Sequence, residues 1–261
     1  MSLNIRTYRD LADSDRSGLP EQIAAQRRRV AERLAVVGRL VAVMSGKGGV
    51  GKSFVTAHLA RTLARAGKAV GVLDADLNGP TIPRLLDTHR SPLTTHSGGV
   101  EPAVGLDGVR CMSMGMLLEE GAPMAFRGPQ HESFVWRGAL EAAATRELLG
   151  DVCWGPLDWL FVDLPPGIQR YAELADLLPK PPAVLTVTIP TAESGDAVRR
   201  ALRVARERGS PLLGVIENMV GPPFAGDAGD ALAREFNIPL LARIPWHPTP
   251  DTWHRLAERL A

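Results

Sequence analysis

Short apolar runs alternate with amphipathic helical segments along most of this chain. Most of the runs are nearly continuous in aliphatic and β-branched residues, which is typical of strands buried on both faces of a parallel sheet. They lie at residues 40–45, 69–74, 159–163, 183–189, 212–218 and 239–245. The pattern predicts helices at residues 52–66, 131–149, 170–178, 194–208, 227–236 and 250–260. This alternation predicts an α/β fold: a doubly wound, mainly parallel sheet flanked by helices, in a single domain.

Two regions depart from the alternation. Residues 1–37 form a polar start followed by one helix, expected at residues 20–35, and we interpret them as an N-terminal extension. Residues 87–130 are rich in Gly, Pro and Ser, and only residues 108–114 resemble a strand. We expect an irregular insertion there, with one or two edge strands.

The composition narrows the function classes. A net charge of +1 argues against a dedicated nucleic-acid binder, so no nucleic-acid partner is expected. No run approaches the eighteen apolar residues of a membrane span, and the polar start has no apolar core of a signal peptide. We therefore expect a cytoplasmic protein without a membrane partner.

The two cysteines, Cys111 and Cys153, cannot make a disulfide framework and show no metal-ligand spacing. The six histidines show no such spacing either. Each cysteine is therefore interpreted as a small buried apolar residue.

The stretch SGKGGVGKSF, residues 45–54, carries two of the four lysines of the chain. Its Gly46, Gly51, Lys52 and Ser53 satisfy the pattern G-x-x-x-x-G-K-[ST], between the first predicted strand and a strong helix. Glycines let consecutive N–H groups point at phosphate oxygens, and the helix N-terminus adds partial positive charge. Lysine would neutralise the β- and γ-phosphates, and the serine hydroxyl would ligate Mg²⁺. The stretch predicts a site for a nucleoside triphosphate with Mg²⁺.

Three acidic residues follow strands at the edge where open α/β sheets bind ligands. Asp74 and Asp76 end the second run, and Asp163 ends the run at residues 159–163. A single aspartate there is as often a turn or cap residue. Two such strand ends downstream of a phosphate-binding loop favour aspartates that bind a metal ion and position water.

With its additional Lys47, GKGGVGK resembles the deviant Walker A motif of the MinD/ParA/ArsA class of P-loop ATPases. Further stretches resemble the Mrp (ApbC) branch of that class, known as iron–sulfur cluster carrier ATPases. These stretches are DADLNGPTIPRLL (74–86), MSMGML (112–117), FRGPQ (126–130), WGPLDWLFVDLPPG (154–167), GVIENM (214–219) and IPLLARIPWHP (238–248). The resemblance covers residues 38–261, which we take as the ATPase domain.

The resemblance implies a slow, homodimeric ATPase that cleaves ATP to ADP and phosphate. Lys47 would reach the nucleotide of the partner subunit, Asp76 would position the attacking water, and Asn218 would contact adenine. The implied metal site is Ser53, Asp74 and Asp163. The implied nucleotide-binding residues are Gly46, Lys47, Gly48, Gly49, Val50, Gly51, Lys52, Ser53, Phe54 and Asn218.

The sequence departs from the branch at three places. Residues 217–230 contain no cysteine where the branch usually has a C-x-x-C pair, so the standard thiolate ligands for an iron–sulfur cluster are missing. Phe54 replaces a threonine that contributes a hydroxyl near the α-phosphate, and residues 168–170 replace a Thr/Ser–acid pair.

Three functional hypotheses follow from the resemblance and its departures. The first is an Mrp-like ATPase in iron–sulfur cluster assembly or transfer, with a scaffold or apo-protein as partner. The second is an ATP-dependent dimer switch that docks a protein partner and carries no cluster. The third is a MinD- or ParA-like positioning ATPase, which is disfavoured because residues 250–260 are expected to pack on the sheet rather than on a membrane.

Overall fold

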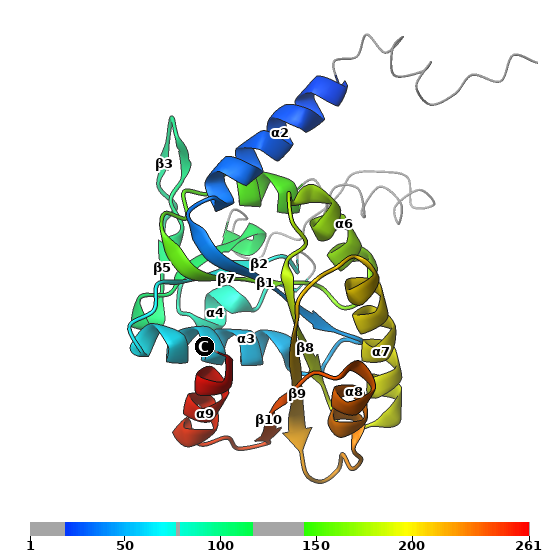
Figure 1. Ribbon diagram of the computed structural model, residues 1–261. Coiled ribbons are helices and arrows are strands. Elements are labelled where there is room, and N and C mark those ends of the chain that lie inside the picture. The colour runs from blue at the N-terminus through cyan, green and yellow to red at the C-terminus, as the bar shows by residue number, and fades with distance from the viewer. Residues whose placement is uncertain (1–18, 77–78, 117–143, 261) are drawn as a thin grey trace, which may run out of the picture.

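The computed structural model describes residues 19–76, 79–116 and 144–260, and its centre is an eight-stranded sheet (Figure 1). In sheet order the strands are β10 (Leu240–Pro245), β9 (Leu212–Val220), β8 (Ala183–Thr188), β1 (Val37–Ser45), β7 (Leu157–Asp163), β2 (Val70–Asp74), β6 (Arg110–Ser113) and β5 (Ala103–Val104). Every neighbouring pair is parallel except β5 and β6, which are antiparallel. The predicted doubly wound, mainly parallel sheet is confirmed.

Helices cover both faces of this sheet (Figure 1). The covering helices are α3 (Lys52–Arg65), α4 (Ile82–Leu85), α6 (Gln169–Leu177), α7 (Ala192–Glu207), α8 (Ala228–Phe236) and α9 (Pro250–Leu260), whereas α2 (Leu19–Leu34) extends away from the sheet. Of the helix predicted at 131–149, residues 144–149 are helical, in a segment that continues to 151, and the remainder lies outside the described residues. No helix in the described parts of the chain is long and apolar enough to cross a membrane.

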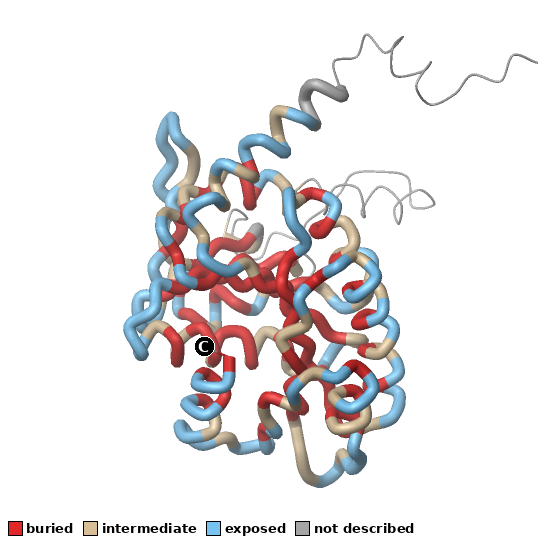
Figure 2. Tube along the Cα trace, in the orientation of Figure 1, coloured by how far each residue is buried: buried red, intermediate tan, exposed pale blue. Residues whose placement is uncertain are grey.

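The sheet separates two apolar cores because alternate strand residues face opposite sides. On β1, Val41 and Val43 pack with α3 and α9, whereas Ala42 and Met44 pack with α6, α7 and α8. All four side chains are buried, and Figure 2 shows buried chain running through the sheet between the two helical layers. Burial on both faces explains why the strands were recognisable as continuous apolar runs.

The irregular insertion is confirmed over its described part, residues 87–116. A small antiparallel hairpin, β3 (Thr95–His96) with β4 (Gly99–Val100), stands apart from the main sheet. β5 forms the edge of the main sheet, and the strand expected at 108–114 is β6. Residues 117–130 lie outside the described part.

Helices at the two ends of the described chain are packed on the domain. In α2, Val30 is buried and Arg29 forms a 2.7 Å ion pair with Asp151. In α9, Trp253 and Leu256 are buried, and this helix packs on α3 and β10, as expected from its apolar side. The division of the chain at residue 37 stays a prediction.

Candidate nucleotide-binding site

The glycine-rich loop of residues 46–51 joins the carboxyl end of β1 to the first turn of α3. Gly49 and Gly51 have φ values of +78° and +79°, which glycine adopts without steric cost. A Cβ at Gly51 would stand 2.3 Å from Asn218 Nδ2, and a Cβ at Gly46 would stand 2.3 Å from a side chain of α7. The loop can therefore follow this path only with glycine at both ends.

Lys52 begins α3, and its side chain is only 6% exposed. Its Nζ lies 2.7 Å from Asp163 Oδ2, at the carboxyl end of β7. The two atoms are close but not aligned as a hydrogen bond, so Nζ has no hydrogen-bond partner among the described residues. A buried ammonium with unsatisfied protons is costly. Phosphate oxygens entering the loop would supply the missing acceptors.

Two hydroxyls of α3 hold the Asp163 carboxylate in place. Ser53 Oγ donates to Oδ2 at 2.5 Å, and Thr56 Oγ1 lies 2.9 Å from Oδ1 and 3.0 Å from the Lys52 carbonyl. Asp163 and Thr56 are fully buried. Thr56 was not predicted from the sequence, because only the folded structure shows that its turn of α3 faces β7.

Asp74 stands directly opposite Asp163 on the neighbouring strand β2. Its two carboxylate oxygens accept hydrogen bonds from the backbone N–H groups of Asp76 and Ile82, both at 3.1 Å. Burial, followed by the negative charge of Asp163, raises the pKa of Asp74 to about 7. The fold thus brings together the predicted Ser53, Asp74 and Asp163, whose oxygen atoms are the donors that hard divalent cations prefer.

A pocket of about 490 Å³ opens over the loop, which is within the range of small-molecule sites. Its lining residues are Ser45, Lys47, Gly48, Gly49, Val50, Gly51, Lys52, Ser53, Phe54, Asp76, Thr81, Arg84, Leu85 and Pro166. The predicted Lys47 and Asp76 are therefore both at this pocket, and both are partly exposed. Arg84, exposed on α4, is a further cation at the pocket that sequence reasoning missed.

Asn218 lies near the end of β9 and is buried. Its Nδ2 donates to the carbonyl of Val50 at 2.9 Å, so the amide supports the loop from behind. Asn218 is not among the residues lining the pocket. Its expected contact with adenine stays a prediction.

Phe54 places an aromatic ring in the first turn of α3. Its ring centroid lies 4.3 Å from that of His58 and 5.6 Å from that of Trp253. His58 and Trp253 are themselves stacked, with centroids 4.8 Å apart. Phe54 therefore connects the start of α3 to the C-terminal helix α9.

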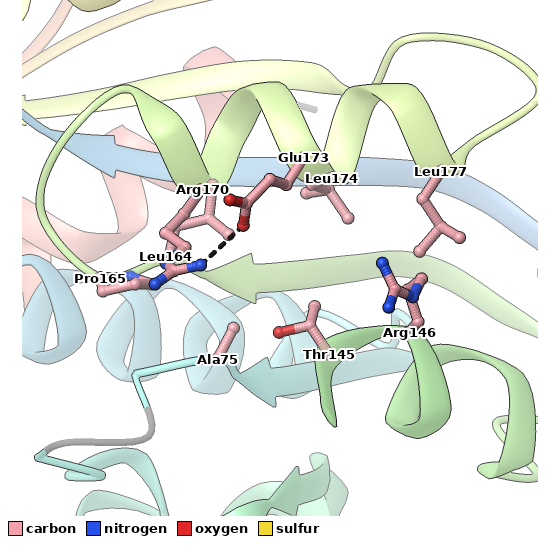
Figure 3. A pocket seen from close by; sticks show the side chains of 9 residues that line it. All are labelled: Ala75, Thr145, Arg146, Leu164, Pro165, Arg170, Glu173, Leu174 and Leu177. Atoms are coloured by element: carbon pink, nitrogen blue, oxygen red, sulfur yellow. Dashed lines mark hydrogen bonds and ion pairs between the residues drawn. The ribbon is translucent and has the colours of Figure 1, made fainter. Parts of the chain in front are cut away.

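A second pocket lies between α6, the turn after β7 and the helical segment at residues 144–151 (Figure 3). Arg170 and Glu173 line it and form a 2.7 Å ion pair. Its volume is about 20 Å³, which is room for roughly one water molecule. It is too small for a nucleotide, so the pocket over the glycine loop is the candidate site.

The two cysteines have different surroundings. Cys111 is fully buried on β6, as expected, and burial raises the pKa of its thiol to about 12. The interpretation of Cys153 as buried was wrong, because this residue is partly exposed. Its Sγ lies 3.7 Å from His96 Nε2, beside Glu101. A ligand-like grouping thus exists that sequence spacing did not reveal.

These features define a P-loop NTPase, a class of nucleotide-binding protein. They are the parallel sheet, the glycine loop between β1 and α3, the buried Lys52 and the aspartate that ends β7. Residues 36–255 match the ParA family model described as NUBPL iron-transfer P-loop NTPase, and the chain belongs to that family. The resemblance recognised from the sequence motifs is confirmed at this level.

Similar proteins cover most of the chain. The iron-sulfur cluster carrier protein of Saccharolobus solfataricus is 35% identical over 88% of this chain and 78% of its own length. The cytosolic Fe-S cluster assembly factor NUBP2 of Bos taurus is 40% identical over 82% of each chain. A solved nucleotide-binding protein from Archaeoglobus fulgidus, in complex with ADP and with Co found, is 33% identical, with a TM-score of 0.70 over 89% of this chain and 91% of that one.

Proposed function

We propose that this chain is a homodimeric, Mg²⁺-dependent ATPase that acts with a protein partner in iron–sulfur cluster assembly or transfer in the cytoplasm. The observation that carries the ATPase assignment is the buried Lys52–Asp163 pair at the glycine loop. The cluster assignment is supported by membership of an iron-transfer family and by relatives that are named as cluster carriers and assembly factors.

The residues present fit ATP and Mg²⁺. Lys52 Nζ is buried and short of acceptors, which suits a phosphate, and the glycine loop excludes side chains from the space beside the backbone. Ser53, Asp74 and Asp163 would hold Mg²⁺, which supplies charge neutralisation to the phosphates when bound. Phosphates would also compete with Asp163 for Lys52, so we infer that nucleotide binding lengthens the Lys52–Asp163 ion pair.

Hydrolysis would depend on positioning and on charge rather than on covalent chemistry. Asp76, at the edge of the pocket, would accept a hydrogen bond from the attacking water and orient it toward the γ-phosphate. Lys47 would cross to the nucleotide of the partner subunit and stabilise the charge that develops there. Its partial exposure on the pocket wall supports a role between subunits.

An iron–sulfur cluster carried as cargo would have no pair of thiolate ligands here, because residues 217–230 contain no cysteine. Cys111 is buried within the sheet and is not available as a ligand. We therefore propose that this chain supplies the nucleotide-driven step while the partner supplies cluster ligands. The same observation favours a second candidate function, an ATP-dependent dimer switch that docks a partner without any cluster.

Anaerobic transfer of a [4Fe–4S] cluster from a donor scaffold to an apo-protein, followed by absorbance, separates the two candidates. If the protein takes part in transfer, the cluster should be transferred faster in the presence of wild-type protein and ATP than in the presence of the Lys52→Ala variant and ATP. If the chain changes nothing, the cluster assignment is wrong. The switch function would then be tested by capturing partners in ATP and in ADP, and identical captures would exclude it too.

A further inference from the structure

The hairpin β3–β4 and the segment after residue 151 bring three metal-ligating side chains together. His96 Nε2 lies 2.8 Å from Glu101 Oε1 and 3.7 Å from Cys153 Sγ, and all three ligand atoms lie within 4.8 Å of one another. Among the described residues this is the one His/Cys/Asp/Glu group so arranged. None of the three lines the nucleotide pocket.

We propose that His96, Glu101 and Cys153 form a site for a divalent transition-metal ion of borderline softness, such as Zn²⁺, with the fourth position open to water. A thiolate, an imidazole and a carboxylate are the three ligand types such an ion takes in proteins. With the thiolate and the carboxylate ionised, the ligands carry two negative charges and balance the charge of the ion. The proposal is independent of the cluster-transfer function.

The separation of the sulfur and nitrogen atoms is close to that of a tetrahedral site. Bond lengths of about 2.3 Å to sulfur and about 2.05 Å to nitrogen place these two atoms about 3.6 Å apart at the tetrahedral angle. The observed separation of Cys153 Sγ and His96 Nε2 is 3.7 Å. The nitrogen–oxygen separation would open from the observed 2.8 Å to about 3.4 Å, as the ion replaces the shared proton.

The backbone holds the three residues in place without the metal. The N–H of Cys153 donates to the carbonyl of Val100 at 2.8 Å, and residues 100 and 152 form a parallel bridge. Gly99 permits this approach, since a Cβ there would stand 2.1 Å from the carbonyl of Asp151 and 3.1 Å from Cys153 Sγ. The hairpin thus reaches the cysteine only because residue 99 is glycine.

Hydrogen bonds around His96 would change when a metal ion binds. Gly98 N–H donates to His96 Nδ1 at 3.0 Å, which places the ring proton on Nε2 in the free protein. Metal binding at Nε2 would move that proton to Nδ1 and break the hydrogen bond from Gly98. The bond is exposed to solvent, so its loss would cost little free energy. Arg33 of α2 donates to the carbonyl of Gly98, so the N-terminal helix also supports the hairpin.

Titration of the full-length, untagged chain with Co²⁺, in excess Mg²⁺ and without nucleotide, tests the site. A thiolate–Co²⁺ charge-transfer band should appear, saturate at one ion per chain and disappear when Zn²⁺ is added. The band should be absent in Cys153→Ser, and His96→Gln and Glu101→Gln should each weaken Co²⁺ binding at least about tenfold. His254→Gln, an exposed histidine on α9, is the matched control and should bind as wild type does.

ATP binding by each variant checks that it is folded. Absence of the band in the wild-type chain would overturn the proposal without recourse to any variant. A band that persists in Cys153→Ser, or equal Co²⁺ affinity in wild type, His96→Gln and Glu101→Gln, would overturn it as well.

Discussion

Single glycines determine whether the phosphate loop can form. Gly49 and Gly51 have nearly the same φ, but a Cβ at Gly49 would meet nothing within 4 Å, whereas one at Gly51 would meet Asn218 Nδ2. Alanine should cost about 1 kcal/mol at either position for the left-handed backbone. Gly51→Ala should cost about 1–3 kcal/mol more, because the contact must be relieved. Urea unfolding measures both, and equal losses would contradict the packing described at Gly51.

Thr56 provides a second residue-scale prediction. Its hydroxyl lies 2.9 Å from Asp163 Oδ1, whereas the hydroxyl of Thr62, six residues later on α3, donates to the carbonyl of His58. Thr56→Val should lower the ATP hydrolysis rate about tenfold, because the carboxylate loses one of its orienting partners. Thr62→Val is the matched control and should leave the rate unchanged. Equal slowing in both variants would show that the effect is not specific to Asp163.

The residues that could be predicted from the sequence are those whose spacing is local. Lys52 and Ser53 are fixed by a motif that is read along one loop and one helix turn. Thr56 and Arg84 belong to the same site but reach it through packing that no spacing shows. His96 and Cys153 are 57 residues apart, and only the contact between the hairpin and the segment after residue 151 brings them together.

At the scale of elements, the central strands were predicted well because they are buried on both faces. Their ends were less well predicted: β1 begins at Val37 rather than at residue 40, and its first residues are partly exposed. The short strands β3, β4 and β5 have two residues each, too few to carry a period. Tertiary contacts, not local pattern, determine them.

The contact between α3 and α9 should respond to pH through His58. Burial, then the charges of Arg61 and Arg65, lower the pKa of His58 below 6.5, and its ring is stacked on Trp253. The folded state therefore binds this proton less readily than the unfolded state does. The stabilisation is complete above pH 6.5 and is lost as the pH falls through the lowered folded-state pKa.

Between about pH 7 and about pH 5 the His58 contribution to the free energy of unfolding should thus decrease, whereas the raised pKa of Asp74 acts in the opposite direction in both proteins. Relative to His58→Gln, the wild-type protein should therefore lose stability as the pH falls across this range. Denaturant unfolding across that range measures both slopes. The matched variant His254→Gln, at an exposed position of α9, should keep the wild-type slope. The same slope in wild type and His58→Gln would exclude this histidine as the source.

At the scale of the molecule, the parallel order of the strands brings the residues of the nucleotide-binding site together. β1, β7 and β2 are neighbours, so the glycine loop, Asp163 and Asp74 meet at one edge of the sheet. The sequence could predict this edge, since ligands of open α/β sheets bind at the carboxyl ends of strands. It could not predict the second grouping at His96, which lies on a hairpin outside the main sheet. A two-subunit ATPase cycle is the central proposal at this scale.

Mixing two inactive variants tests that proposal most directly. Lys47→Ala keeps Lys52, the lysine proposed to bind the phosphates, and Lys52→Ala keeps Lys47, the lysine proposed to act across the dimer. Each variant alone should hydrolyse ATP far more slowly than wild type. In an equal mixture half of the dimers are mixed, and each mixed dimer contains one complete site, so the rate should recover to about a quarter of wild type. A mixture no faster than the average of the two variants would contradict catalysis by Lys47 in the partner's site.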